Sequence, residues 1–279
     1  MIRRAQTAED FAFCADICNA VNPHYAVTGE LFAARATGSF LVHEGGGYAL
    51  VDRSSLPDTA YAMVRVRPEV RRRGSCSSLL EVAAAEVRAL ELGRIYGRVD
   101  GADVESLAFA ERRGFRETGR DLTVLLDVKP GDGEVADGIV ELEDAHLPGA
   151  YGVAAECLPE MALPQVAAAP PYEEWIEREN DCSPVAFVAV DGDAIVGYAR
   201  LNELSVARLE NGLTAVRHSH RRRGIALALK RAQIAWAAEH GYREILTSTV
   251  AGNDAMRAVN ERLGYKPFSE EIVVEGPVP

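Results

Sequence analysis

The sequence has no apolar run long enough to cross a membrane. Its apolar stretches fall well short of the ~18 residues that a spanning helix requires. The first residues, Met1–Gln6, lead into an acidic segment and not into the apolar core of a secretory signal peptide. We therefore expect a cytoplasmic protein without a membrane partner.

Cysteine is scarce, and the few cysteines lack the spacing of a metal site. The five residues are Cys14, Cys18, Cys76, Cys157 and Cys182. Their number is odd and no C-x-x-C pair occurs, so neither a disulfide framework nor a zinc site is expected. Free cysteines are usually buried, which predicts reduced thiols and no metal.

Basic residues are also fewer than acidic ones. The chain has 30 Lys and Arg residues against 42 Asp and Glu residues, which gives a net charge of −12. A surface of this sign does not favour nucleic acid as a partner. Hydrophobic residues make up 48% of the 279 residues, enough to form a core in each of two domains.

One basic turn interrupts this acidic background. Residues 214–226 read as a strand, the turn Arg221–Gly224 and the start of a helix. Backbone N–H groups at a helix start bind anions such as a pyrophosphate, and Gly224 and Ala226 leave room for a close approach. The turn lacks the Gly-Lys-Ser/Thr ending of a P-loop. The alternative interpretation is a basic turn whose side chains lie in solvent.

The same pattern occurs twice in the chain. Arg71 and Arg221 lie 150 residues apart, and so do Gly114 and Gly264. A shared offset at separate landmarks is typical of a tandem duplication of one α/β domain.

A break in composition separates the two copies. Pro, Gly and acidic residues cluster at 129–134, as in a linker, which predicts domains over 1–130 and 136–279. Short turns between the early strands of each copy predict an antiparallel meander. The long helix, strand and helix that follow are predicted at 75–92, 95–99 and 104–113 in the first copy, and at 225–240, 244–250 and 254–262 in the second.

Two segments resemble a known family. Arg221–Ala226 fits the R/Q-x-x-G-x-G/A signature of the GCN5-related N-acetyltransferase (GNAT) superfamily, and Asn253–Tyr265 is similar to a later segment of that family. The two-copy architecture resembles mycothiol synthase-like acetyltransferases. The resemblance implies an α/β (α+β) fold with two tandem GNAT-like domains, each a mixed, mostly antiparallel central sheet flanked by helices.

The resemblance also implies a function. Acetyl-CoA would be the donor, and its acetyl group would pass directly to a primary amine of a small molecule or peptide. The residues implied to bind the cofactor are Thr214, Ala215, Val216, Arg221, Arg222, Arg223, Gly224, Ile225, Ala226, Leu227 and Asn253. The backbone N–H of Val216 would stabilise the thioester oxyanion. Asn253 also reads as a helix N-cap, and both roles are compatible.

The catalytic acid and base are less clearly marked. Asn260 stands where the family usually has a Tyr acid; its amide can hydrogen-bond to a thiolate but cannot give up a proton. Tyr265 reads as a core residue. Glu210 and Glu203 are the candidate bases, and each also reads as a solvated charge. The neighbouring His218 and His220 are expected to contact phosphate or solvent.

The first copy departs further from the signature. Cys76 replaces a small residue, Asp103 replaces Asn, and Ala110 replaces Tyr. We expect this domain to be degenerate and non-catalytic, serving to support the second. Its candidate second CoA site comprises Val66, Arg71, Arg72, Arg73 and Gly74.

Three functional classes remain open. The first is an N-acetyltransferase active in the C-terminal domain. Its acceptor pocket would form from residues 158–175. Tyr172 and Trp175 would either line this pocket or pack in the core. The second is a non-catalytic acyl-CoA sensor, and the third is an interaction scaffold. Either a monomer or a homodimer is expected.

Overall fold

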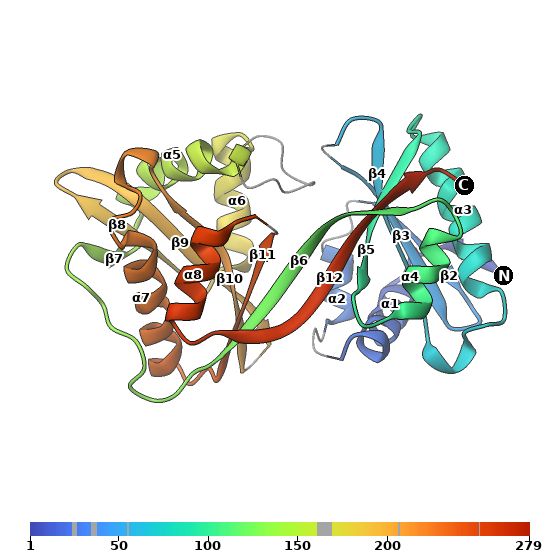
Figure 1. Ribbon diagram of the computed structural model, residues 1–279, viewed down its shortest axis with the longest axis horizontal. Coiled ribbons are helices and arrows are strands. Elements are labelled where there is room, and N and C mark those ends of the chain that lie inside the picture. The colour runs from blue at the N-terminus through green and yellow to red at the C-terminus, as the bar shows by residue number, and fades with distance from the viewer. Residues whose placement is uncertain (24–26, 35–37, 55, 161–168, 206, 251) are drawn as a thin grey trace. The chain divides into compact units, whose positions relative to one another are not determined.

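The computed structural model describes residues 1–279 except 24–26, 35–37, 55, 161–168, 206 and 251 (Figure 1). The chain forms two compact units. The first unit consists of Met1–Arg120 together with Glu271–Pro279, and the second of Asp121–Glu270. None of the described helices is both long and apolar enough to span a membrane.

The first unit has a six-stranded sheet in the order β1-β2-β3-β4-β5-β12. Its elements, with η for a 3₁₀ helix, are β1 (Ile2–Arg4), α1 (Ala8–Val21), α2 (Gly29–Ala34), β2 (Ser39–His43), β3 (Gly47–Arg53), β4 (Thr59–Val66), η1 (Pro68–Val70), α3 (Ser75–Ala89), β5 (Arg94–Asp100), α4 (Val104–Glu111) and the end of β12 (Lys266–Pro277). Among the described strands of this unit, only β4 and β5 pair in parallel. Alternating strand residues face opposite sides: Leu41 and Ala49 pack with α3, whereas Phe40 and Val42 pack with α1.

The second unit repeats this plan with the strand order β6-β11-β10-β9-β8-β7. Its elements are the end of β6 (Arg116–Asp127), β7 (Ile139–Glu141), η2 (Asp144–His146), α5 (Leu147–Cys157), η3 (Leu158–Glu160), α6 (Tyr172–Cys182), β8 (Val185–Asp191), β9 (Ala194–Ser205), β10 (Arg208–Val216), η4 (His218–His220), α7 (Ile225–Glu239), β11 (Glu244–Val250), α8 (Asp254–Arg262) and the start of β12. Phe187 and Leu201 pack with α7, and Val188 and Tyr198 with α5 and α6. The expected α/β fold, with a mostly antiparallel sheet between helices, is confirmed.

The last strand of each copy lies in the unit of the other copy. Asp121–Asp127 of β6 pairs with β11 in the second unit, and Glu271–Pro277 of β12 pairs with β5 in the first. Pro277 lies opposite Arg94 and Asp127 opposite Glu244, so the partners keep the 150-residue offset. The unit boundaries therefore fall after residues 120 and 270, and not at the expected 1–130 and 136–279.

The expected linker at 129–134 is a packed loop within the second unit. A Cβ atom on Gly133 would lie 2.3 Å from the backbone nitrogen of Ala235 in α7. Glu134 N donates to Arg231 O at 3.4 Å, and the Arg231 guanidinium lies 3.7 Å from the Glu134 carboxylate. Gly133 thus allows a close approach to α7 here, and the segment does not separate domains.

Candidate cofactor and acyl-transfer site

The basic turn of the second unit presents the open start of α7. Arg222 and Gly224 have φ values of +66° and +83°, and no side chain caps α7, unlike α1 and α8. A Cβ atom on Gly224 would have no heavy atom of the rest of the described chain within 4 Å. The helix start therefore combines backbone N–H donors, the positive end of the helix dipole and open space, which together suit an anion.

Arg221 holds this turn in shape. Its Nε donates to Val216 O at 3.2 Å, and its backbone N–H donates to His218 O at 3.3 Å. The exposed Arg222 and Arg223 are then the side chains of the turn best placed to reach a second phosphate.

The first unit has the same turn with a different charge balance. Arg72 and Gly74 have φ values of +65° and +88°, and no side chain caps α3. Arg71 lies 3.2 Å from Asp103, and Arg72 lies 3.6 Å from Glu105. Burial raises the pKa of Asp103, but hydrogen bonds from Ser106 and Arg71 outweigh this and lower it overall.

The second unit has no carboxylates at those two positions. Asn253 and Ala255 stand where the first unit has Asp103 and Glu105. The turn of the second unit is therefore the more positive of the two.

A fork opens between the parallel strands β10 and β11. Among the described strand residues, their pairing covers only Arg208–Glu210 with Glu244–Leu246. Beyond it, the register of β10 against β9 shifts between Asn211 and Thr214, as at a β-bulge. The fork, defined as 211–216 of β10 and 247–250 of β11, leaves one edge of β10 without a ladder partner on β11.

The predicted cofactor residues line this fork and the turn. Thr214, Ala215 and Val216 form the end of β10, where Thr214 Oγ1 is buried without a hydrogen-bond partner among the described atoms. The carbonyl of Val216 also accepts from Cys157 Sγ at 3.4 Å. Asn253 Oδ1 accepts from Met256 N at 3.2 Å, so the predicted N-cap is confirmed.

The predicted acid position is buried on α8. Asn260 is 3% exposed, its Nδ2 lies 3.3 Å from Thr249 Oγ1, and its Oδ1 has no partner among the described atoms. Tyr265 is a core residue, as expected, and its hydroxyl donates to Asn211 Oδ1 at 2.7 Å.

The two candidate bases differ in position. Glu203 is exposed and accepts from Tyr242 Oη at 3.0 Å. Glu210 is half-buried at the last paired position before the fork. Because strand side chains alternate and Leu209 packs with α7, Glu210 faces the side that α5 and α6 cover.

The two histidines contact carboxylates. His218 Nδ1 lies 2.7 Å from Glu156 Oε1, and His220 Nε2 lies 3.4 Å from Asp191 Oδ2. Glu156 also accepts from His218 N at 2.7 Å and from Arg217 Nη1 at 3.0 Å, and these hydrogen bonds lower the pKa of Glu156. Glu156 thus ties α5 to the end of β10, a contact that helical periodicity alone did not reveal.

The sequence analysis also missed a polar cluster at the fork. Lys230 is 1% exposed, and its Nζ lies 2.9 Å from Asn211 Oδ1 and 3.4 Å from Thr247 Oγ1. Asn211 Nδ2 donates to Gln233 Oε1 at 2.9 Å. Burial lowers the pKa of Lys230 to about 7. The sequence did contain a sign of this cluster, because Lys230 and Gln233 lie three residues apart on the inner face of the helix predicted at 225–240.

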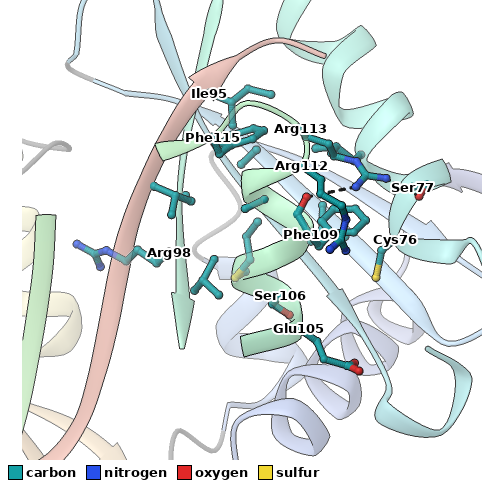
Figure 2. Close-up of a pocket in the computed structure, with 18 of the residues that line it drawn as sticks. Cys76, Ser77, Ile95, Arg98, Glu105, Ser106, Phe109, Arg112, Arg113 and Phe115 are labelled. Carbon is teal, nitrogen blue, oxygen red and sulfur yellow. Dashed lines mark hydrogen bonds between the residues drawn. The ribbon is translucent and has the colours of Figure 1, made fainter. Parts of the chain in front are cut away.

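A cavity of about 600 Å³ lies at the equivalent place in the first unit (Figure 2). It is formed by β4, β5, α3 and α4 with Val274 of β12, and the predicted Arg71, Arg72 and Gly74 line it. Arg113 Nη2 donates to Ser77 Oγ at 2.8 Å, and its guanidinium lies 3.5 Å from the Phe109 ring centre (Figure 2).

The packing aromatics near the expected acceptor region form one stack. Trp175 is 3% exposed, and its ring lies 5.7 Å from Tyr151 and 5.6 Å from Tyr198. Tyr172 lies 5.2 Å from Tyr151. Trp175 is therefore a core residue; residues 161–168 of the expected pocket lie outside the described residues.

Comparison with known proteins finds a family match within the second unit. Residues 153–265 match the model of the acetyltransferase (GNAT) family, and they contain both the basic turn and α8. The resemblance to the GNAT superfamily is thus confirmed for this segment of the second unit. None of the curated protein sequences matches the chain.

Solved structures share the fold of the whole chain. A tandem GNAT protein from the clavulanic acid biosynthesis pathway matches 100% of this chain and 99% of its own length, with a TM-score of 0.77 and 18% identity. A GCN5-related N-acetyltransferase from Sphaerobacter thermophilus matches 100% of this chain and 95% of its own, with a TM-score of 0.75 and 17% identity. An acetyltransferase of the GNAT family from Colwellia psychrerythraea matches 99% of both chains, with a TM-score of 0.67 and 14% identity.

Proposed function

We propose that the chain is an N-acyltransferase whose second unit moves an acyl group from a CoA thioester to a primary amine of a small molecule or peptide. Acetyl-CoA is the donor that the family implies. The observation that carries the proposal is the uncapped start of α7 beside the fork, within the segment that matches the family.

The second unit fits the cofactor better than the first. N–H groups of residues 222–227 would hold the pyrophosphate, and Arg222 and Arg223 would add charge. The open edge of β10 would pair with the pantetheine arm, for which the orphaned Thr214 Oγ1 offers a polar partner. In the first unit, Asp103 and Glu105 already neutralise two arginines, so a CoA site there would be weaker.

The transfer forms a bond between the amine nitrogen and the acyl carbon and breaks the carbon–sulfur bond. The expected Val216 N–H lies beside the phosphate turn, about 17 Å along an extended strand from Asn211. A backbone N–H of β10 nearer the register shift between Asn211 and Thr214 would therefore stabilise the carbonyl oxygen in its place, and Asn260 Nδ2 would hydrogen-bond to the leaving sulfur. Glu210, at the closed end of the fork, would take the amine proton directly or through water. Glu203 is the weaker candidate because it is exposed and already bonded to Tyr242.

Two matched glycines test the proposal. Gly224→Glu and Gly74→Glu change residues with φ values of +83° and +88°, neither with an atom within 4 Å of an added Cβ, so both cause similar backbone strain. The Gly224 variant should lose acetyl-CoA binding and thiol release with an amine panel, because its carboxylate enters the phosphate site. The Gly74 variant should retain both, and the reverse result would move the active site to the first unit.

A second candidate function is acyl-CoA sensing without catalysis. The observation that favours it is Asn260 in place of an acid. Tight acetyl-CoA binding without turnover across amino sugars, amino acids, polyamines and peptides would support the sensor and reject the transferase.

A further inference from the structure

The buried polar cluster lies at the closed end of the fork. Asn211 and Thr247 are the first residues of β10 and β11 beyond the last paired residues, and Lys230 of α7 contacts both. Val216, beside the proposed phosphate turn, is about 17 Å from Asn211 along an extended strand. A CoA arm that follows β10 from the turn therefore directs its acyl end toward this cluster.

The cluster has more hydrogen-bond donors than acceptors. Asn211 Oδ1 accepts from both Lys230 and Tyr265, and Gln233 Oε1 accepts from Asn211. Gln233 Nε2, on a side chain that is 0% exposed, has no partner among the described atoms. Lys230 carries three N–H groups for its two acceptors. A buried surplus of donors around a cation calls for an acceptor, and an anionic one suits it best.

No carboxylate of the described residues lies within salt-bridge distance of Lys230. Burial therefore lowers the pKa of Lys230, to about 7, with no described carboxylate nearby to raise it again. The Tyr265 ring has its centre 5.3 Å from Lys230 Nζ and supplies only a partial counter-charge. The ammonium form thus lacks a formal counter-ion in the protein itself.

The first unit lacks this cluster at the same offset. Leu80 stands in place of Lys230, Ala83 in place of Gln233 and Gly97 in place of Thr247. The folded core therefore tolerates apolar residues at these positions. The polar set is particular to the unit in which we propose that transfer occurs.

We propose that the closed end of the fork is an acyl subsite that selects an acyl group ending in a carboxylate, such as malonyl or succinyl, with Lys230 and Gln233 as the specificity-determining residues. This inference rests on the proposed function and refines its donor. The distal carboxylate takes no part in bond changes: the amine attacks the thioester carbon, CoA thiolate leaves, and the amine proton passes to the base. A bound carboxylate supplies the missing counter-ion and the missing acceptor together.

Calorimetric titration of the full chain with three thioesters tests this. Succinyl-CoA and butyryl-CoA have equally long acyl groups and differ in a terminal carboxylate or methyl, while acetyl-CoA reaches less far. We expect succinyl-CoA to bind at least tenfold more tightly than butyryl-CoA. Lys230→Met should abolish this ratio, whereas Leu80→Met, the matched change in the first unit, should preserve it.

Further variants and outcomes keep the test decisive. Gln233→Leu and Thr247→Val, which leave the cation in place, should each reduce the ratio in part and serve if Lys230→Met does not fold. Equal or tighter binding of butyryl-CoA by the unmodified chain would overturn the acyl subsite alone. Failure of all three thioesters to bind would overturn the proposed function as well.

Discussion

Replacing Lys230 with Met should stabilise the second unit at neutral pH. The change removes a buried ammonium group and keeps an unbranched side chain of similar reach. A pKa lowered from 10.5 to about 7 corresponds to roughly 5 kcal/mol of unfavourable free energy for the charged form. Loss of the hydrogen bonds to Asn211 and Thr247 offsets about 1–3 kcal/mol of this gain. The expected net stabilisation is therefore about 2–4 kcal/mol at pH 7 and below.

The stabilisation that Lys230→Met provides should decrease as pH rises. Between pH 7 and 10.5 the unfolded chain binds more protons at Lys230 than the folded chain, so the unmodified protein gains stability as pH rises. Met does not titrate, so the advantage of the variant should shrink by up to about 1.4 kcal/mol per pH unit across this window. Near pH 10 the variant should be the less stable protein.

Urea unfolding monitored by tryptophan fluorescence measures this effect in the relevant unit. The chain has two tryptophans, Trp175 and Trp236, and both belong to the second unit. Unfolding curves from pH 6 to 10 should show the difference in unfolding free energy falling through zero, with Leu80→Met as a pH-independent control. A constant difference would refute the claim that Lys230 is buried as a charge without a counter-ion.

Two further predictions concern the charges of each unit. Asp103→Asn should release Arg71 and strengthen CoA binding in the first unit by roughly fivefold to tenfold, measured calorimetrically in a Gly224→Glu background; unchanged affinity would show that Asp103 does not limit that site. Glu210→Gln should lower kcat/KM by about 10²–10⁴ and remove the acidic limb of its pH profile, because an amide cannot accept the amine proton. Glu203→Gln should retain the limb, and loss of the limb in this variant instead would reassign the base.

Local sequence patterns predicted much of the fold and of the turn. The shared 150-residue offset, the glycine at each helix start and the N-cap at Asn253 depend on a few neighbouring residues, and the structure has all three. The segment that matches the family model contains the second-unit turn and the Asn253 N-cap. Backbone geometry of this kind is encoded locally, which is why it could be read from the sequence.

The exchanged strands could not be predicted in the same way. β6 and β12 have the same register against β11 and β5 that an unexchanged arrangement would require, so apolar alternation is equally satisfied by either unit. Likewise, Lys230 reads as a solvated charge until α7, β10 and β11 are brought together. The contacts of Glu156 with Arg217 and His218 span about sixty residues and leave no periodic signal.

Hydrogen–deuterium exchange with and without acetyl-CoA tests the central claim most directly, that the turn and fork of the second unit hold the cofactor. Bound acetyl-CoA should slow the exchange of backbone N–H groups in peptides covering 211–216 and 222–227, where the pantetheine arm and the pyrophosphate would bind. The equivalent peptides covering 61–66 and 72–77 should change far less. Protection confined to the first unit, or absent from both at saturating acetyl-CoA, would contradict the assignment.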